Sequence, residues 1–312
     1  MKTLKSDNST VRQWLNQGEE PLVAVGIMQC EQIRIVLTGT YLCAENGLCY
    51  SGNLQFEICD HQIRFQDRCF EALSFLPQSE SCVCELEDVT IGIGFHWQRN
   101  ENQQFEGSIH LLPNNGKIQV INRLGVEKYL YAVIGSEVRA TSYKELLKAH
   151  AVISRSWLLA PMTGEESTVP MQQEMSNGEI VRWYERDAHT LFDVCADDHC
   201  QRYQGITRTG TEAVREAIAT TRGELLMMDN EICDARFSKS CGGATEYFHN
   251  CWSSKRPYTY LQSFRDAIDQ PLPDLTQEAE AERWIRSTPT AFCNIAEKEV
   301  LRQVPNGYDP ET

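Results

Sequence analysis

The chain has 312 residues, of which 41 % are hydrophobic, and this content indicates a globular protein rather than a disordered one. Its formal net charge of −15 argues against a nucleic-acid ligand, because the phosphates would be repelled, and also disfavours anionic membranes. It has no run of 18 apolar residues, so we expect no transmembrane segment. The start lacks the apolar core of a secretory signal, which leaves open a trimmed chain or a protein that stays inside the cell.

The first third of the chain predicts a β-rich structure. Residues 1–20 are polar with one amphipathic patch, and we expect an N-terminal arm or short helix there. Residues 21–104 contain short β-rich runs separated by turns with glycine and asparagine, which predict a small antiparallel sheet or barrel. Asn115-Gly116, between two further runs, is a strong hairpin signal. The predicted class is α+β.

Thirteen cysteines are present, and seven of them lie between Cys30 and Cys84. The spacings of these seven match no zinc-finger template. Free cysteines behave as small buried hydrophobes, so we expect reduced core thiols, which suit a reducing compartment. The alternative is a disulfide framework, in which the odd count leaves at least one thiol unpaired.

Residues 126–160 predict two helices joined at a short break. The first, roughly 126–138, has apolar residues close to helical spacing. Ser142 followed by Glu145 has the pattern of a capping box, which predicts the start of the second helix.

Three charged residues in this helix pair are candidates for chemistry. Glu137 lies at the end of the first helix, and Lys148 and Arg155 share one face of the second. A carboxyl facing a cationic stripe suits catalysis. On the pattern alone, the favoured interpretation is a surface glutamate beside a solvated basic face, because most exposed charges make no specific contact.

Further along the chain, four potential metal ligands fall within twelve residues. They are His189, Cys195, His199 and Cys200. Thiolate and imidazole are good zinc ligands, and four of them make a closed tetrahedral shell. The alternative is a strand pair with incidental cysteines and a surface histidine.

The remaining segments carry weaker signals. We expect a surface insertion over 161–186, because the segment is polar and shows little apolar periodicity. A helix is predicted over 211–220, followed by a strand. The tail, 275–312, is acidic and predicts a helix anchored by Trp284 and Ile285.

Two stretches resemble one known family, SpoIID/LytB. The first is INRLGVEKYLYAVIGSEV, residues 121–138, followed by ELLKAHAVISRSWLLA, residues 145–160. The residues that match the family pattern are Asn122, Leu124, Glu127, Tyr129, Leu130, Ser136, Glu137, Leu147, Lys148, Ala149, Ala151, Val152 and Arg155. The family's glutamine is His150 here, and its usual proline two residues after the glutamate is Arg139. The second stretch is SCGGATE, residues 240–246, with Trp252 to Asp266 downstream.

The resemblance implies a SpoIID-like mixed α/β catalytic domain over 105–274, with the central helix pair carrying Glu137. It implies a peptidoglycan lytic transglycosylase that cleaves the β-1,4 bond after N-acetylmuramic acid in denuded glycan strands and forms a 1,6-anhydro product. Glu137 would act as the single acid and base, with a pKa raised by an apolar setting.

The resemblance also implies binding sites. We expect Lys148 and Arg155 to contact glycan, together with a loop whose paired glycines let backbone approach a ligand: Ser240, Cys241, Gly242, Gly243 and Thr245. The alternative for the loop is an ordinary tight turn. No cofactor is required for the chemistry, but His189, Cys195 and Cys200 resemble a family zinc site, with His199 as a fourth ligand.

Two other functions stay open at this point. One is a glycan-binding module without catalysis that enhances a partner cell-wall amidase. The other is a cytoplasmic domain that has lost activity. The family implies the cell envelope or periplasm as location, and the cytoplasm is the alternative.

Overall fold

The computed structural model describes residues 3–138, 141–163, 189–207, 211–238, 240–252 and 258–294, and the backbone of 173–176 and 179–182. The chain forms two compact units. Unit 1 comprises Met1–Glu165, His189–Ala235 and Asn306–Thr312, and unit 2 comprises Glu166–Ala188 and Arg236–Pro305. An unbroken run of strands over residues 22–125 is followed by most of the helices, which confirms the α+β class.

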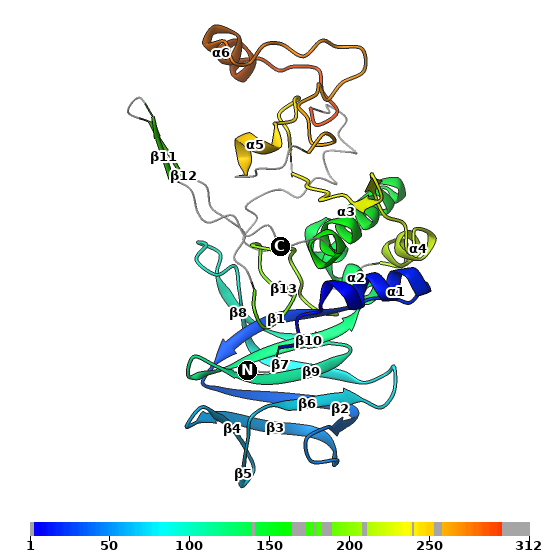
Figure 1. Cartoon of the computed structure of the whole chain (residues 1–312), viewed down its shortest axis with the longest axis vertical. Helices are drawn as coiled ribbons and strands as arrows, with labels where there is room; N and C mark the ends of the chain where they lie inside the picture. Colours follow the sequence, from blue (N-terminus) through cyan, green and yellow to red (C-terminus); the bar gives the residue numbers. More distant parts are fainter. Residues whose placement is uncertain are drawn as a thin grey trace. The chain divides into compact units, whose positions relative to one another are not determined.

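Unit 1 is built on an 11-stranded sheet (Figure 1). Its main path runs β13 (Val194–Cys195), β1 (Leu22–Cys30), β10 (Lys117–Gly125), β9 (Ser108–Asn114), β6 (Leu73–Pro77), β2 (Gln32–Cys43), β3 (Cys49–Cys59), β4 (Gln62–Phe65) and β5 (Arg68–Phe70). β7 (Val83–Ile91) pairs with β2 and with β8 (Arg99–Phe105). Within the described residues, the parallel pairing in this sheet is that of β1 with β13.

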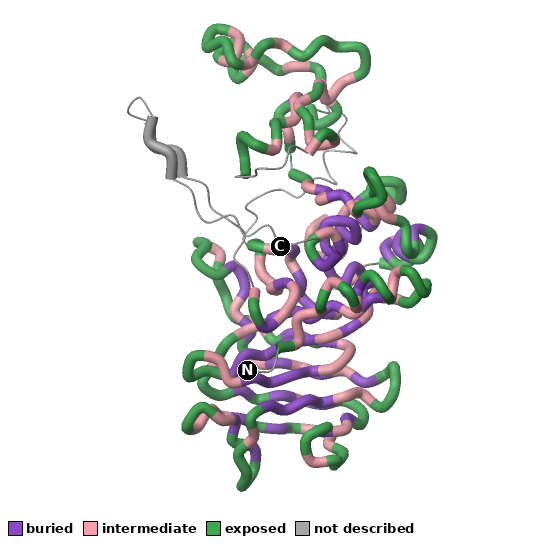
Figure 2. Tube along the Cα trace, in the orientation of Figure 1, coloured by how far each residue is buried: buried purple, intermediate pink, exposed green. Residues whose placement is uncertain are grey.

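The sheet forms because its strands alternate buried and exposed side chains, so that one face closes on a core. β2 shows this alternation at Ile33, Ile35 and Leu37, which are all buried. The predicted hairpin is confirmed: Asn115 and Gly116 join β9 to β10 with φ of 50° and 76°, as a tight turn of this kind requires. Figure 2 shows buried residues along the strands and in the helices beside the sheet.

The sheet does not stop at the boundary expected near residue 104. β9 and β10 pair with β6 and β1, which come from the earlier β-rich part of the chain. These long-range pairings make residues 22–125 one continuous sheet, whereas the expected division at 104/105 separates strands that hydrogen-bond to each other.

Four helices of unit 1 gather at the β1–β10 part of the sheet (Figure 1): α1 (Asn8–Gln17), α2 (Val126–Glu137), α3 (Lys144–Thr163) and α4 (Glu212–Thr220). α1 confirms the N-terminal helix, and the Asp7 carboxylate caps it by accepting from the Thr10 N–H at 2.9 Å. α2 and α3 confirm the predicted pair, and α4 confirms the helix at 211–220.

The start of α3 differs from the predicted capping box. α3 begins at Lys144 rather than directly after Ser142. The Glu145 carboxylate accepts from Lys148 Nζ at 2.9 Å, an i,i+3 pair on the exposed face, instead of reaching back to the cap. Arg139, where the family has proline, lies outside the described residues.

The described part of unit 2 contains two short helices, α5 (Phe248–Cys251) and α6 (Glu278–Arg286), and the hairpin β11 (Gln173–Ser176) with β12 (Glu179–Arg182). α6 confirms a helix in the acidic tail. Ile285 is 79 % exposed and therefore does not anchor it, whereas the Trp284 ring lies 4.5 Å from the Arg265 guanidinium. Most of the predicted insertion over 161–186, and residues 295–312 of the tail, lie outside the described residues.

All 13 cysteines are free thiols. In the N-terminal part, Cys43, Cys82 and Cys84 are buried, as expected of core thiols, but Cys49 and Cys69 are exposed.

A short strand pair, β14 (Met227–Met228) with β15 (Glu231–Ile232), follows α4. Among the described helices, none has the length and apolar character needed to cross a membrane.

Candidate active site and metal centre

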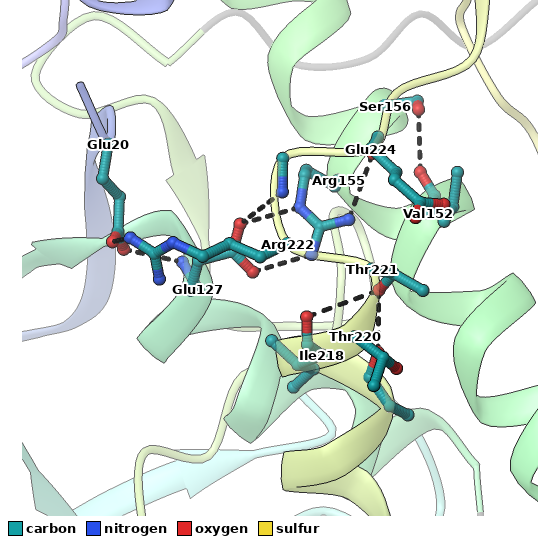
Figure 3. Close-up of polar contacts among 12 residues, drawn as sticks. Glu20, Glu127, Val152, Arg155, Ser156, Ile218, Thr220, Thr221, Arg222 and Glu224 are labelled. Atoms are coloured by element: carbon teal, nitrogen blue, oxygen red, sulfur yellow. Dashed lines mark hydrogen bonds and ion pairs between the residues drawn. The ribbon is translucent and has the colours of Figure 1, made fainter. Parts of the chain in front are cut away.

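The N-terminus of α2 is fixed by a buried ion pair, which Figure 3 shows. Arg155 of α3 donates from Nε to Glu127 Oε1 at 3.0 Å and from Nη2 to Oε2 at 2.7 Å. Its Nη1 donates to the Glu224 carbonyl at 3.1 Å. The side chains of Arg155 and Glu127 are 1 % and 12 % exposed. Arg155 therefore holds α2, α3 and the segment after α4 together, and the expectation that it contacts glycan is wrong because its guanidinium is enclosed.

A second carboxylate caps the same helix end. Glu20 Oε1 accepts from the Glu127 N–H at 3.0 Å, and its other oxygen pairs with Arg222 (Figure 3). A Cβ on Gly125 would lie 2.3 Å from Glu20 Oε1, so the glycine makes room for this cap. Negative charge at a helix N-terminus is favourable, and it is shared here by two side chains.

The buried side of α2 holds the segment that follows the predicted metal ligands. The Tyr129 hydroxyl donates to Gln201 Oε1 at 3.1 Å, and its ring stacks on Tyr203 with centroids 5.2 Å apart. The Tyr203 hydroxyl donates to Asn122 Oδ1 at 2.6 Å, and Gln201 Nε2 donates to the Ser154 carbonyl at 3.3 Å. Residues 201 and 203 are thereby fastened to β10, α2 and α3.

Glu137, the last residue of α2, accepts a hydrogen bond from Arg202, the residue between Gln201 and Tyr203. The Arg202 N–H donates to Glu137 Oε1 at 2.8 Å. Within the described part of the chain, Oε2 accepts no hydrogen bond. Arg202's own guanidinium pairs with Asp198 through Nε at 3.0 Å and Nη2 at 3.2 Å.

The surroundings of Glu137 raise its pKa above the usual value for a glutamate. Loss of hydration on burial is the main cause, and the nearby Asp198 carboxylate adds to it. The Arg202 N–H and charge act in the opposite direction and are outweighed. A half-buried carboxyl that retains its proton to higher pH can serve as a general acid.

The four predicted metal ligands converge in unit 1. Their ligand atoms all lie within 4.8 Å of one another. His189 Nε2 is 3.4 Å from Cys200 Sγ, and His199 Nδ1 is 3.6 Å from Cys200 Sγ and 3.8 Å from Cys195 Sγ. Tetrahedral zinc with typical bond lengths keeps sulfur and nitrogen ligands about 3.6 Å apart, so the residues fit this ion.

The fold brings these ligands together by a short strand. Cys195 lies on β13, in register with Gly26 of β1, and the Cys200 N–H bonds to the Asp197 carbonyl at 3.0 Å to turn the chain back. Cys200 directly precedes Gln201. The ligand cluster and the residue that binds Glu137 are thus parts of one tight loop.

A small cavity of about 80 Å³ lies beside the ligand cluster, lined by Trp97, Asp197 and Arg202 among others. Pockets for small molecules usually enclose about 300–1,000 Å³, so this cavity is too small for a pair of sugar rings. Glu137 is not among its lining residues.

The other predicted glycan-binding residues are placed differently. Lys148 is 28 % exposed and pairs with Glu145 on α3. The glycine loop belongs to unit 2, where Thr245 Oγ1 donates to the Gln262 carbonyl at 3.0 Å. Gly243 is buried with φ of 96°, and a Cβ there would meet Arg265, Ala291 and Trp284. This glycine is therefore required by packing, and glycan binding by Lys148 and by the loop stays a prediction.

Sequence reasoning missed Gln201, Arg202 and Tyr203. Their adjacency to Cys200 was the available signal, because residues next to a metal ligand share its fixed backbone. Their hydrogen-bond partners outside this loop lie 47 to 81 residues away along the chain, so local patterns do not reveal them.

Comparisons with known proteins match the part of the chain that contains Glu137 and the metal-ligand cluster. Residues 114–228 match the family model SpoIID, Stage II sporulation protein. Stage II sporulation protein D of Bacillus subtilis (strain 168) is 27 % identical over 157 residues, which cover 50 % of this chain and 42 % of that protein. The protein of the same name from Bacillus amyloliquefaciens is 24 % identical over 153 residues, 49 % of this chain and 42 % of that protein.

An uncharacterized protein of Brachyspira hyodysenteriae (strain ATCC 49526 / WA1) is 25 % identical over 155 residues, 50 % of this chain and 36 % of that protein. The matches thus span about two fifths of the length of the curated relatives. No solved structure matches the chain significantly.

Proposed function

Since this chain belongs to the SpoIID family through residues 114–228, we propose that it is a lytic transglycosylase acting on denuded peptidoglycan strands. The proposed bond is the β-1,4 bond between N-acetylmuramic acid and N-acetylglucosamine, and the proposed place of action is therefore the cell envelope. The observation that carries the proposal is the half-buried Glu137, which lies within the matched segment, has a raised pKa and is held by one backbone N–H.

The proposed reaction uses one carboxyl twice. Oε2 of protonated Glu137 gives its proton to the glycosidic oxygen as the C1–O bond breaks and positive charge develops on the sugar ring. The resulting carboxylate then takes the proton of the C6 hydroxyl, and the C6 oxygen forms a bond to C1. The product is a 1,6-anhydro ring, no water is consumed, and Glu137 ends protonated.

The Arg202 N–H serves both halves of this cycle. It binds Oε1 at 2.8 Å and so orients the carboxyl with Oε2 available for proton transfer. Because it opposes the effect of burial on the pKa, it also keeps the ionised form accessible for the second proton transfer. Arg202 is a positioning residue in this scheme.

The metal ligands act through the same loop. His189, Cys195, His199 and Cys200 would hold a zinc ion, which supplies a structural cross-link. The two thiols and two imidazoles fix residues 195–200, and the backbone beyond Cys200 then presents the Arg202 N–H to Glu137. We expect removal of zinc by a chelator to lower turnover by loosening this loop.

The test compares Glu137→Gln with the wild type on denuded glycan, with anhydro-muramyl products measured by mass spectrometry. Gln keeps the shape and the acceptor for Arg202 but has no proton to give, so we expect a loss of about 10²–10⁴-fold. Glu145→Gln is the matched control, because Glu145 is a glutamate of the next helix whose side chain is 81 % exposed. Equal product from wild type and Glu137→Gln would reject the assignment.

The same assay separates the proposal from a glycan-binding enhancer. The wild-type protein alone must release anhydro products if it is an enzyme. If it releases none but increases the release of stem peptides by an added cell-wall amidase, the enhancer function is correct instead.

A further inference from the structure

Three potential metal ligands meet in unit 2, whereas the cluster already described belongs to unit 1. Cys241 lies in the glycine loop, Asp266 lies about 25 residues later, and Cys293 follows α6. Their ligand atoms lie within 4.8 Å of one another. The chain thus brings two thiols and one carboxylate from three separate segments to one point.

The separations of these atoms match coordination of one metal ion. Cys241 Sγ is 3.9 Å from Cys293 Sγ and 3.4 Å from Asp266 Oδ2. In tetrahedral zinc sites with usual bond lengths, two sulfur ligands are about 3.8 Å apart, and a sulfur and an oxygen ligand are about 3.5 Å apart. A disulfide instead requires the sulfurs to be about 2.05 Å apart.

Backbone contacts hold the three segments in place. The Asp266 N–H donates to the Gly243 carbonyl at 3.0 Å, and the Phe292 N–H donates to the Asp266 carbonyl at 2.9 Å. The Cys293 N–H donates to Asp266 Oδ2 at 3.3 Å, which orients the carboxylate toward both thiols. The side chain of Arg265 adds hydrogen bonds to the carbonyls of Gly243 and Thr290.

The described part of unit 2 lacks a hydrophobic core, so a cross-link at this point would stabilise it. Among its described residues, Gly243 alone is buried, so these residues provide no buried apolar side chain (Figure 2). Large apolar side chains such as Phe264, Ile268 and Phe292 are more than half exposed. Small units without an adequate core are commonly stabilised by metal ions or disulfides.

We propose that Cys241, Asp266 and Cys293 form a second metal centre, which takes a thiophilic divalent cation, zinc above all. Each thiol loses its proton when the ion binds, and three protein ligands leave a fourth position for water or another ligand. The ion joins the glycine loop to the segment after α6 and stabilises unit 2. The inference is independent of the proposed glycosidic chemistry.

The test is the zinc content of the full-length protein, purified under reducing conditions and dialysed, as measured by mass spectrometry of the metal. We expect about two zinc ions per wild-type chain and about one in each of the double variants Cys241→Ser/Cys293→Ser and Cys195→Ser/Cys200→Ser. Cys251→Ser is the matched control, since Cys251 is an exposed thiol of the same unit, and it should retain two.

A second measurement decides the question even if the Cys241→Ser/Cys293→Ser variant fails to fold. Cobalt(II) added to Cys195→Ser/Cys200→Ser, which leaves Cys241 and Cys293 intact, should give thiolate-to-cobalt absorption at about one ion per chain. Asp266→Asn in that background should weaken cobalt binding at least tenfold. Absence of this absorption, or two zinc ions retained by Cys241→Ser/Cys293→Ser, would overturn the proposal, as would a Cys241–Cys293 disulfide in the freshly purified protein.

Discussion

Replacing Arg155 by methionine should destabilise unit 1 strongly. Arg155 is 1 % exposed and makes two hydrogen bonds to Glu127, whose side chain is 12 % exposed. Breaking a buried pair by removing one partner leaves the other charge without compensation and costs about 3–5 kcal/mol. The Glu224 carbonyl loses a donor as well. We therefore expect the free energy of unfolding to fall by about 3–5 kcal/mol, measured by urea denaturation followed by tryptophan fluorescence.

Two comparisons make this result specific. Arg34→Met removes an exposed pair with Glu87, in which the side chains are 58 % and 30 % exposed, and should cost less than about 1 kcal/mol. Glu127→Met combined with Arg155→Met removes both charges and should recover much of the stability. If Arg155→Met costs less than about 1 kcal/mol but abolishes turnover on glycan, Arg155 contacts the substrate and the structural role assigned to it is refuted.

Three further predictions concern stability. Burial lowers the pKa of His150 from its usual 6.5 to about 4, so the unfolded chain binds this proton more tightly than the folded one. The free energy of unfolding should therefore fall as pH drops from 6.5 through 4, by up to about 3 kcal/mol. His150→Gln should flatten this part of a pH series of urea denaturation curves, and an unchanged slope would contradict the burial effect. Burial raises the pKa of Glu137, so its protonated form favours the folded state at low pH, and this contribution to stability is lost as pH rises through the raised pKa. Glu137→Gln should therefore be at least as stable as the wild type near pH 8. A clearly lower midpoint of thermal unfolding for the variant at that pH would count against this reasoning. Gly125→Ala displaces Glu20 from the N-terminus of α2 and should lower the free energy of unfolding by about 0.5–2 kcal/mol in the same assay. Gly116→Ala is the comparison: its added Cβ meets open space, but the residue has a φ of 76°, so this variant reports the cost of backbone strain alone.

Features encoded over short stretches of sequence could be predicted. Helical spacing located α2 and α3 and placed Glu137 at the end of α2. The turn chemistry of Asn115-Gly116 located a hairpin, and four ligand-type residues within twelve positions located the cluster around Cys200. In each case the interacting residues are neighbours along the chain, so their spacing already determines their geometry.

Features that depend on distant partners could not be predicted. Helical spacing places Arg155 and Lys148 on one face of α3. Arg155 is nevertheless buried, because it bonds to Glu127 and to the Glu224 carbonyl, which lie 28 and 69 residues away along the chain. The cysteine and aspartate ligands of unit 2 are separated by 25 and 27 residues, and spacing of this length carries no pattern. The hydrogen bond from Arg202 to Glu137 spans 65 residues.

The pH dependence of anhydro-muramyl release from denuded glycan tests the role of Glu137 most directly. A general acid must be protonated in the free enzyme, so kcat/KM should decline as pH rises through the raised pKa of Glu137. Glu137→Gln should lose about 10²–10⁴-fold of this activity, and its residual activity should lack that decline. If Glu137→Gln instead releases the same product with the pH profile of the wild type, the proton comes from another group and Glu137 is not the acid.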